Sequence, residues 1–349
     1  MKDKVILPVK YPAITSWQWH ATLFSIIGDD DNAKKWIYSN YIQLRCYNIA
    51  EYTTGDEILL CDMMPGSSAL KECPYLIFSL ITKPQIKSYC GDVIDFIIKT
   101  LDIGGYVYGA FDEARILCDV AVDYKFPHEL FIYGYNMEEE VFYVGDFTFK
   151  DKYSYSKVSF EAVKRGFDAL SASEDHVFKD DYKGTRGLYV IQKNVDSKYY
   201  DLDKVLIQRT LIEYLESQDT KDHFRMMRNR FRDTVFGVDV YEALAKRIDK
   251  QLNKPEPDFD IRALHIAYDH KVLMYDRLKY LMANEVIPYD QQMLDQYAEV
   301  VEYMLAARNL LIRISITNNV ADGERIADYL TKAKKMEVPI LQNVVELLD

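Results

Sequence analysis

The sequence lacks any apolar run as long as the roughly 18 residues that a membrane-spanning helix requires. Residues 1–4 also lack the continuous apolar stretch of a secretory signal peptide. Cysteine is scarce, and the five cysteines are an odd number without Cys-x-x-Cys spacing, which argues against a disulfide framework and against a zinc site. His265 and His270 are five residues apart, which does not fit the four-residue spacing of a helical zinc motif. We therefore expect a cytoplasmic protein that needs no membrane and no metal.

A phosphate-binding loop of the Walker type is also missing, and the pair Gly104 and Gly105 is too short a signal for a dinucleotide site. The chain has 349 residues, of which 49% are hydrophobic, and this favours two domains with a sizeable core. A net charge of −12 argues against general nucleic-acid binding, because the phosphate backbone attracts a basic surface. Tyrosine is abundant, with 28 residues, and such clusters suit either a partly hydrated core or a groove for an aromatic ligand.

The N-terminal part of the chain alternates helical patterns with short strand patterns. Apolar residues at helical spacing predict helices, and short apolar or alternating runs predict strands. The predicted helices are 17–27, 34–44, 91–101 and 159–169, and the predicted strands are 106–111, 128–135, 141–147 and 187–192. Helices followed by an antiparallel set of strands predict an α+β domain over residues 1–195.

From about Asp201 the pattern changes to long periodic segments, which predict an all-helical domain over residues 196–349. The predicted helices are 202–217, 238–252, 261–284, 291–316 and 321–335. Pro255 and Pro257 interrupt this series, and Asp258 or Asp260 can cap the helix that follows. The repeated leucine and aromatic positions are typical of the core of a helical bundle.

A histidine and an aspartate stand at the outer ends of the most strongly patterned hairpin. His128 stands at the start of one apolar strand, and Asp146 closes the next after a polar Asn/Glu turn. A hairpin brings its outer ends together, so we expect the two side chains to meet. An imidazole that is oriented by a carboxylate forms two thirds of a nucleophilic triad. The hairpin alone leaves two interpretations: an ordinary hydrogen-bonded histidine with a turn-forming aspartate, or a catalytic His128 that Asp146 orients.

The first predicted helix begins where a nucleophile would be activated. Free backbone N–H groups at a helix N-terminus lower the pKa of a thiol and help to hold an oxyanion. Thr15 or Ser16 can cap this helix, and Gly28 ends it. Its start holds Gln18 and Trp19, however, and no cysteine.

Several stretches of residues 5–170 occur in a distinctive order. They are Trp19 to Ile27, Tyr38 to Leu44, Glu72 to Leu76, Tyr106 to Tyr108 with Phe111 to Glu113, His128 to Asp146, and Tyr153 to Tyr155 with Val158 to Phe160. Together they resemble a bacterial family related to the N-terminal domain of butirosin biosynthesis protein H. The resemblance implies a papain-like, that is cysteine-protease-like, α+β fold with an antiparallel sheet. It also implies an acyltransferase that takes an acyl group from a carrier-protein thioester and forms an amide with an amine.

The nucleophilic cysteine of the family precedes the aromatic residue of the first helix, and the resemblance puts Gln18 at this position. A glutamine amide cannot attack a carbonyl. One interpretation is loss of the nucleophile with retention of a binding cleft. In a second, the Gln18 amide polarises a thioester carbonyl while His128 deprotonates the amine. In a third, the nucleophile is Ser16, which is more plausibly a helix cap, or a cysteine from elsewhere, such as Cys118 or Cys46.

Further residues are candidates for substrate binding. Asp112 and Glu113 end the strand before the hairpin, where the family also carries an acidic pair, and they either orient an amine or cap a loop. Trp19, at the start of the first helix, and Tyr135, in the hairpin, are candidates for the wall of the cleft. His20 is interpreted as structural, because residues two apart do not share a helix face.

A dense basic cluster interleaved with phenylalanine and methionine is a candidate partner-binding surface. It consists of Arg225, Arg228, Arg230 and Arg232. A solvated surface explains such a cluster. The sharper hypothesis is a docking site for an acidic carrier protein, which would supply a phosphopantetheine arm in place of any bound cofactor.

Two hypotheses of different classes follow. The first is a papain-like protein of a bacterial peptide or specialised-metabolite pathway, descended from amide-forming acyltransferases that act on carrier-bound thioesters. The second is a non-catalytic pseudoenzyme that binds or scaffolds a carrier protein or synthetase. A hydrolase of peptides or thioesters is a third possibility, and it requires a nucleophile that the sequence does not reveal.

Overall fold

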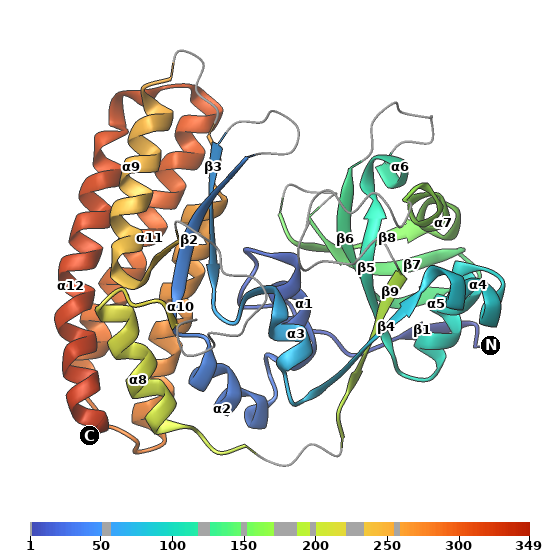
Figure 1. The fold of residues 1–349 in the computed structure, drawn as a ribbon, viewed down its shortest axis with the longest axis horizontal. Helices are drawn as coiled ribbons and strands as arrows, with labels where there is room; N and C mark the ends of the chain where they lie inside the picture. Colours follow the sequence, from blue (N-terminus) through green and yellow to red (C-terminus); the bar gives the residue numbers. More distant parts are fainter. Residues whose placement is uncertain are drawn as a thin grey trace. The chain divides into compact units, whose positions relative to one another are not determined.

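The chain forms two compact units in a computed structural model that describes residues 2–50, 57–117, 126–147, 152–170, 187–195, 200–220, 234–254 and 259–349 (Figure 1). The first unit consists of Met1–Asp30 and Ser67–Tyr199, and the second of Asp31–Gly66 and Tyr200–Asp349. The predicted limit at residue 195 lies close to the last crossing between the units. Residues 31–66, however, belong to the second unit and not to the first. Antiparallel sheets and a helical C-terminal region make this a mixed α+β protein.

The first unit is built on an antiparallel sheet, which in the described part of the chain has seven strands. Six follow in the order β4 (Leu76–Thr82), β9 (Gly187–Lys193), β5 (Tyr106–Asp112), β6 (Pro127–Asn136), β7 (Val141–Asp146) and β8 (Ser154–Ser159), and β1 (Lys4–Ile6) pairs with β6. The four predicted strands agree with β5, β6, β7 and β9 to within one residue at each end. The register puts His128 opposite Phe111 and Gly145 opposite Phe131.

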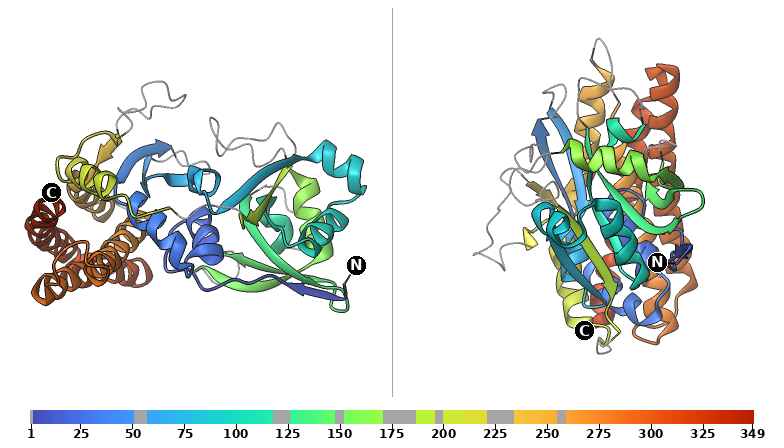
Figure 2. Two further views of the ribbon diagram at one scale, coloured as in Figure 1. Left: turned by 90° about the horizontal axis from the view of Figure 1, so that it is seen from below. Right: turned by 90° about the vertical axis from the view of Figure 1, so that its right-hand side faces the viewer.

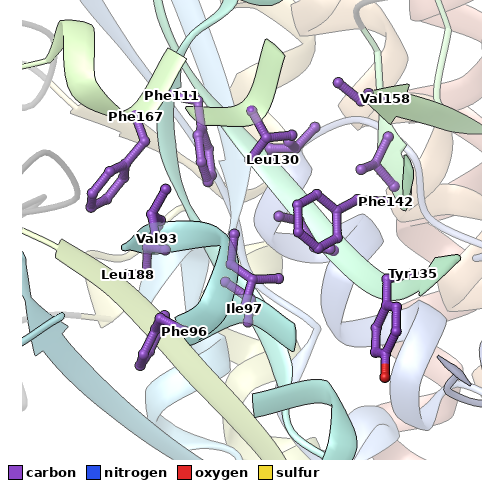
Figure 3. Packing of buried hydrophobic residues seen from close by; sticks show 14 of the residues in the cluster. Val93, Phe96, Ile97, Phe111, Leu130, Tyr135, Phe142, Val158, Phe167 and Leu188 are labelled. Atoms are coloured by element: carbon purple, nitrogen blue, oxygen red, sulfur yellow. The ribbon is translucent and has the colours of Figure 1, made fainter. Parts of the chain in front are cut away.

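Two amphipathic helices pack against this sheet and form a hydrophobic core with it. Helix α5 (Val93–Asp102) is capped by Asp92, whose side chain accepts from the N–H of Ile94, and α7 (Phe160–Ala169) is capped by Ser159. Their apolar faces pack against alternate strand residues (Figure 3). The cluster includes Val93, Phe96, Ile97, Phe111, Leu130, Phe142, Val158, Phe167 and Leu188. This packing holds the ends of β5, β6 and β7 in a fixed register.

Helix α1 (Gln18–Ile27) is buried along its whole length and contacts β6. Its N-cap residue is Trp17, whose side chain makes no capping hydrogen bond. The N-cap residue therefore differs from the predicted Thr15 or Ser16, and the Oγ of Ser16 has no hydrogen-bond partner among the described residues. The remaining helices of this unit are α3 (Ala69–Glu72), α4 (Lys83–Cys90) and α6 (Glu113–Leu117).

The second unit combines a three-stranded sheet with long helices. Within the described residues its strands lie in the order β10 (Thr234–Phe236), β2 (Leu44–Ala50) and β3 (Glu57–Met63). The helices are α2 (Asp31–Asn40), α8 (Lys204–Leu215), α9 (Val240–Leu252), α10 (Arg262–Ala283), α11 (Gln291–Thr317) and α12 (Glu324–Leu348). Helix α11 packs against α10 and against α12, and the three helices lie side by side (Figures 1 and 2). Among the described helices, none is both long and apolar enough to cross a membrane.

The predicted helix 34–44 ends early, at Asn40, and the chain then enters β2. Side chains of α10 receive the backbone at this point: Arg277 donates to the carbonyl groups of Tyr38 and Tyr41. Nε2 of His270 lies 2.7 Å from the carbonyl oxygen of Ile42. These contacts satisfy carbonyl groups that a longer helix would have used, so tertiary structure overrides the helical pattern.

The β2–β3 hairpin also carries a disulfide that the cysteine count argued against. Cys46 and Cys61 lie directly opposite each other, with their Cα atoms 4.0 Å apart, and their sulfur atoms are bonded. The prediction failed because the hairpin that aligns the two residues was not recognised in the sequence.

Candidate functional site

His128 and Asp146 meet at the open end of the β6–β7 hairpin. Nδ1 of His128 lies 3.4 Å from Oδ1 of Asp146. The backbone N–H of Phe147 donates to the same carboxylate oxygen, with an N–O distance of 2.6 Å, and this helps to fix the carboxylate. The carboxylate is therefore positioned to orient the imidazole and to stabilise its protonated form.

A second carboxylate approaches the same ring nitrogen. Oε2 of Glu113 lies 3.5 Å from Nδ1 of His128. Glu113 is the first residue of α6 and directly follows β5, whose pairing with β6 puts Phe111 opposite His128. The strand register thus brings Glu113 to the imidazole, a contact that sequence spacing alone did not predict.

Aromatic rings confine the imidazole from two sides. The ring of Phe126 is stacked on that of His128, with centroids 6.0 Å apart and an angle of 5° between the planes. Phe147 meets the imidazole edge-on, with centroids 6.5 Å apart. The His128 side chain is nevertheless 28% exposed, so a bound molecule can reach it.

The surroundings of His128 favour its protonated form. Burial lowers the pKa of His128, but Asp146, followed by Glu129 and Glu113, outweighs burial and raises this pKa to about 9. The imidazole is therefore cationic at neutral pH. It can donate a hydrogen bond or a proton there, whereas it acts as a general base only where pH approaches this pKa.

The first residue of α1 is tied to β7 beside Asp146. Nε2 of Gln18 donates a hydrogen bond to the carbonyl oxygen of Gly145, with an N–O distance of 2.7 Å. Gln18 is 2% exposed, and its Oε1 has no hydrogen-bond partner among the described residues. The hydrogen bond brings the N-terminus of α1, where backbone N–H groups are free of intrahelical bonds, to the residue that precedes Asp146.

Gln18 gives this position an amide and no nucleophile. An amide nitrogen carries two N–H bonds, and the carbonyl of Gly145 accepts from one of them. The side chain is 2% exposed and ties α1 to β7, and it cannot form an acyl intermediate. The arrangement around Gln18 suits binding better than covalent catalysis.

Of the alternative nucleophiles, Cys46 and Ser16 lie in the part of the chain that the structure describes. Cys46 is bonded to Cys61, and Cys118 lies outside the described residues. Burial raises the pKa of the free Cys73 thiol to about 12, so it is not a thiolate at neutral pH. Ser16 is buried, and its Oγ has no hydrogen-bond partner in the described part of the chain, hence no base that would activate it.

Asp112 holds the backbone of Phe126, the residue that stacks on His128. It is fully buried, and its Oδ1 accepts from the backbone N–H of Phe126 at 2.9 Å. Nε of Arg115 lies 3.7 Å from the other carboxylate oxygen. Of the two interpretations left open for the acidic pair, Asp112 therefore fits the loop cap, while Glu113 faces the imidazole.

Tyr135 does not belong to the site. It lies seven residues from His128 along β6, and a strand rises about 3.3 Å per residue, so roughly 20 Å separate the two positions. Its hydroxyl group donates a hydrogen bond to Oδ1 of Asp102, at 2.7 Å, at the other end of the strand. Trp19 is the second residue of α1, and its ring stacks on that of Trp17 with centroids 5.0 Å apart. His20 is fully buried.

The predicted partner-binding arginines, Arg225, Arg228, Arg230 and Arg232, lie outside the described residues. Within the described ranges, no group of three metal-ligating side chains occurs. His265 and His270 face different partners, since Nε2 of His265 lies 3.9 Å from Asp269 and Nε2 of His270 contacts the carbonyl of Ile42.

Sequence reasoning missed the residues on the other side of β7. Oγ of Ser25, in α1, lies 3.2 Å from the Tyr153 hydroxyl and 3.0 Å from that of Tyr155. A Cβ atom at Gly145 would collide with the Tyr153 hydroxyl and lie 3.1 Å from its ring. The isolated glycine within a strand was the available signal, because it often marks such a close approach.

A scan against protein-family models found no match to this chain, and a search of curated proteins also found none. The function is therefore inferred from the site.

Proposed function

We propose that the first unit is a papain-like domain, descended from amide-forming acyltransferases of bacterial thiotemplated biosynthesis, that binds a carrier-protein acyl thioester without forming an acyl-enzyme. One observation carries the proposal. Gln18 occupies the first position of α1 and is hydrogen bonded to Gly145, beside the His128–Asp146 pair. On this proposal, His128 and Asp146 are the retained pair of a triad, and Gln18 is the residue at the former position of the nucleophile.

The charge state of His128 supports binding. With its pKa at about 9, the imidazole is a cation that can donate a hydrogen bond to a carbonyl oxygen of a bound thioester. The N-terminus of a helix carries partial positive charge, so the start of α1 favours the same oxygen. Both features stabilise a bound acyl group, and neither breaks the thioester.

Thiol-independent transfer is a second candidate, and the retained His128–Asp146 pair favours it. In this mechanism neutral His128 takes a proton from the amine, the amine nitrogen attacks the thioester carbon, and the carrier thiolate leaves and takes up a proton. Because the base must be neutral, transfer would increase as pH rises toward about 9. Acyl transfer to amines that is absent at pH 7 and appears at pH 9, and that His128→Ala abolishes, would favour this mechanism over binding alone.

Replacement of Gln18 by cysteine tests the proposed descent. Gln18→Cys is expected to form an acyl-enzyme with an acyl-pantetheine thioester, detected by mass spectrometry of the intact protein, whereas the natural chain forms none. His128→Ala in the Gln18→Cys background should slow acylation by roughly 100-fold or more, as expected for loss of acid–base assistance. The matched control is Gln292→Cys. Gln292 is also a glutamine in the first turn of a helix, α11, but unlike Gln18 it is exposed. Acylation of Gln18→Cys that is no faster than that of Gln292→Cys would refute the proposal.

Binding is tested separately with the natural chain. An acylated carrier protein should bind more tightly than the same carrier with a free phosphopantetheine thiol, measured by calorimetry. Phe126→Ala should weaken this preference, since Phe126 stacks on the imidazole. Equal affinity for both carriers would contradict recognition of the acyl group.

A further inference from the structure

A pocket in the second unit is independent of the site around His128. Its volume is about 470 Å³, and its walls come from α9, from the residue before α9 and from the sheet of β10, β2 and β3. This volume falls within the range of roughly 300–1,000 Å³ that is usual for small-molecule sites. All of its lining residues belong to the second unit.

The helical wall of the pocket is cationic. Lys246, Arg247 and Lys250 line it together with Ala243, and their spacing of three and four residues puts them on one face of α9. The core-facing residues of the same helix, such as Leu244 and Ile248, are buried and stand on a different face. Three positive side chains therefore converge on one space.

The opposite wall is one face of the small sheet. Val235 is paired with Cys46 and Leu59 with Asn48, and residues 46 and 48 are two apart in β2, so all four side chains share a face. Leu59 is buried, Cys46 belongs to the disulfide, and both line the pocket. This wall offers an apolar surface across from the cations.

The two acidic residues that line the pocket, Asp239 and Glu242, form ion pairs with a lysine that does not line it. Nζ of Lys334, in α12, lies 2.6 Å from Oε1 of Glu242 and 3.8 Å from Oδ1 of Asp239. Lys246 and Arg247, in contrast, have neither an ion pair nor a hydrogen bond to any described residue, and Nε of Arg247 is buried. A buried N–H without an acceptor is unfavourable, and a ligand oxygen would satisfy it. In a chain with a net charge of −12, such unmatched cations are selective for an anion.

We propose that this pocket binds a small organic phosphate. The guanidinium group of Arg247 can donate two parallel hydrogen bonds to phosphate oxygens, and the ammonium groups of Lys246 and Lys250 add charge. The apolar body of the ligand lies against Leu59 and Val235. The positive charges of Lys246 and Arg247 match the two negative charges of a phosphate monoester better than the single charge of a carboxylate.

Calorimetric titration of the full chain with phenyl phosphate, inorganic phosphate and benzoate tests the proposal. Phenyl phosphate should bind at least tenfold more tightly than either of the others, because it alone has both the dianion and the apolar body. Arg247→Met should weaken its binding at least tenfold, and Lys246→Met should do so by a smaller factor. Added salt should weaken binding of the natural chain.

The matched control is Lys335→Met, which removes an exposed lysine of α12 that does not line the pocket. It should leave affinity unchanged, and so should His128→Ala, which separates this proposal from the function proposed for the first unit. Circular dichroism checks that each variant folds, and Lys246→Met, at an exposed position, stays informative if Arg247→Met does not fold. Equal loss of affinity in Lys246→Met and Lys335→Met, or undetectable binding of phenyl phosphate at millimolar concentration, would overturn the proposal.

Discussion

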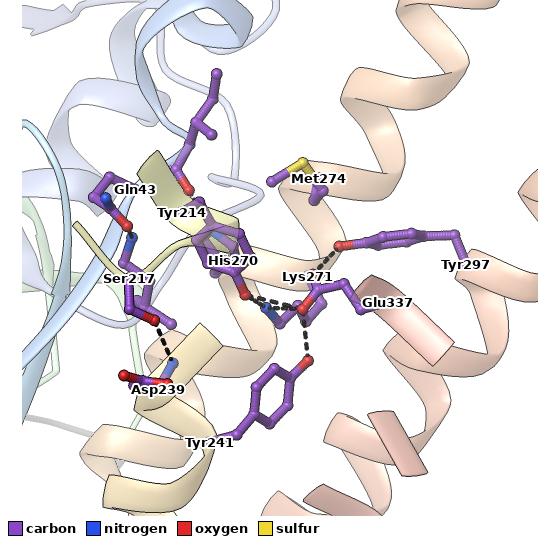
Figure 4. Close-up of polar contacts among 12 residues, drawn as sticks. Gln43, Tyr214, Ser217, Asp239, Tyr241, His270, Lys271, Met274, Tyr297 and Glu337 are labelled. Atoms are coloured by element: carbon purple, nitrogen blue, oxygen red, sulfur yellow. Dashed lines mark hydrogen bonds and ion pairs between the residues drawn. The ribbon is translucent and has the colours of Figure 1, made fainter. Parts of the chain in front are cut away.

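Nζ of Lys271 lies 2.9 Å from Oε2 of Glu337 in the interior of the second unit, where neither side chain is more than 1% exposed. The hydroxyl groups of Tyr214, Tyr241 and Tyr297 also donate to the Glu337 carboxylate (Figure 4). Each of these five residues comes from a different helix, namely α8, α9, α10, α11 and α12. A single carboxylate thus joins five helices through hydrogen bonds that have no competition from water.

Lys271→Met should lower the free energy of unfolding by roughly 3–5 kcal/mol, because it leaves the Glu337 carboxylate buried without a counter-charge. Urea denaturation measures this loss. Lys271→Met combined with Glu337→Leu should cost less than the sum of the two single changes, since the double variant buries no charge. Lys332→Met, which breaks an exposed ion pair with Asp328 on α12, is the matched control and should change stability little. Additive effects in the double variant would show that the two charges are not coupled.

The pKa of His128 should titrate near 9, which NMR of the imidazole protons can measure directly. Asp146→Asn should lower this pKa toward its ordinary value of 6.5, because it removes the neighbour that raises the pKa most. A matched change, Glu139→Gln, removes a carboxylate at the far turn of the same hairpin and should leave the His128 pKa unchanged. A pKa of about 6.5 in the natural chain would contradict the proposed cationic state.

The same titration makes stability depend on pH. A pKa that is raised in the folded state adds stability that is complete below about 6.5 and is lost as pH rises through about 9. Since one pKa unit corresponds to roughly 1.4 kcal/mol, the loss attributable to His128 is up to about 3 kcal/mol. Denaturation of the natural chain and of His128→Gln at pH 6, 8 and 10 should show that the stability gap between them narrows with pH. A constant gap would indicate that Asp146, Glu129 and Glu113 do not raise the pKa of the imidazole.

Gly145→Ala should destabilise the first unit by roughly 1–3 kcal/mol, because the new methyl group collides with the Tyr153 hydroxyl in a packed interior. Tyr153→Phe removes that hydroxyl and should recover part of the loss when combined with Gly145→Ala. Thermal denaturation of the single and double variants measures the coupling. No recovery in the double variant would mean that the rings of Tyr153 and Phe131, and not the hydroxyl, exclude the methyl group.

Gln18→Leu should cost roughly 1–3 kcal/mol, since it keeps the side-chain size but removes the buried hydrogen bond from the Gln18 amide to the carbonyl of Gly145. Gln292→Leu, at an exposed position, is the control for the same chemical change. Urea denaturation distinguishes the two. Equal stability of both variants would show that the Gln18 hydrogen bond contributes little to the attachment of α1.

The sequence predicted the elements whose own pattern matches their final packing. Helices α10 and α11 and the β6–β7 hairpin appear close to the predicted bounds, because one apolar face of each is buried. The β2–β3 hairpin was missed, because residues 38–44 continue a helical pattern and residues 57–63 form an apolar run without clear alternation. Only contacts with Arg277 and His270, more than 200 residues later, explain why the helix stops at Asn40.

For the site, hairpin geometry was enough to bring His128 to Asp146, since both lie on adjacent strands. The approach of Glu113 and Phe126 depends on the pairing of β5 with β6, whose register the sequence does not specify. Tyr135 was misplaced for a similar reason: membership of the hairpin does not say at which end of a ten-residue strand a side chain lies. Position along the strand therefore decides membership of the site.

The chain passes from one unit to the other after Asp30, after Gly66 and after Tyr199. A protease that cut only between residues 196 and 199 would consequently not release two separable halves, because the larger N-terminal fragment keeps residues 31–66 packed among the C-terminal helices. During synthesis on the ribosome, these residues emerge well before α10, which receives them. The second unit can close only after α10, α11 and α12 have also been synthesised, so the β2–β3 hairpin has to wait for helices encoded far downstream of it.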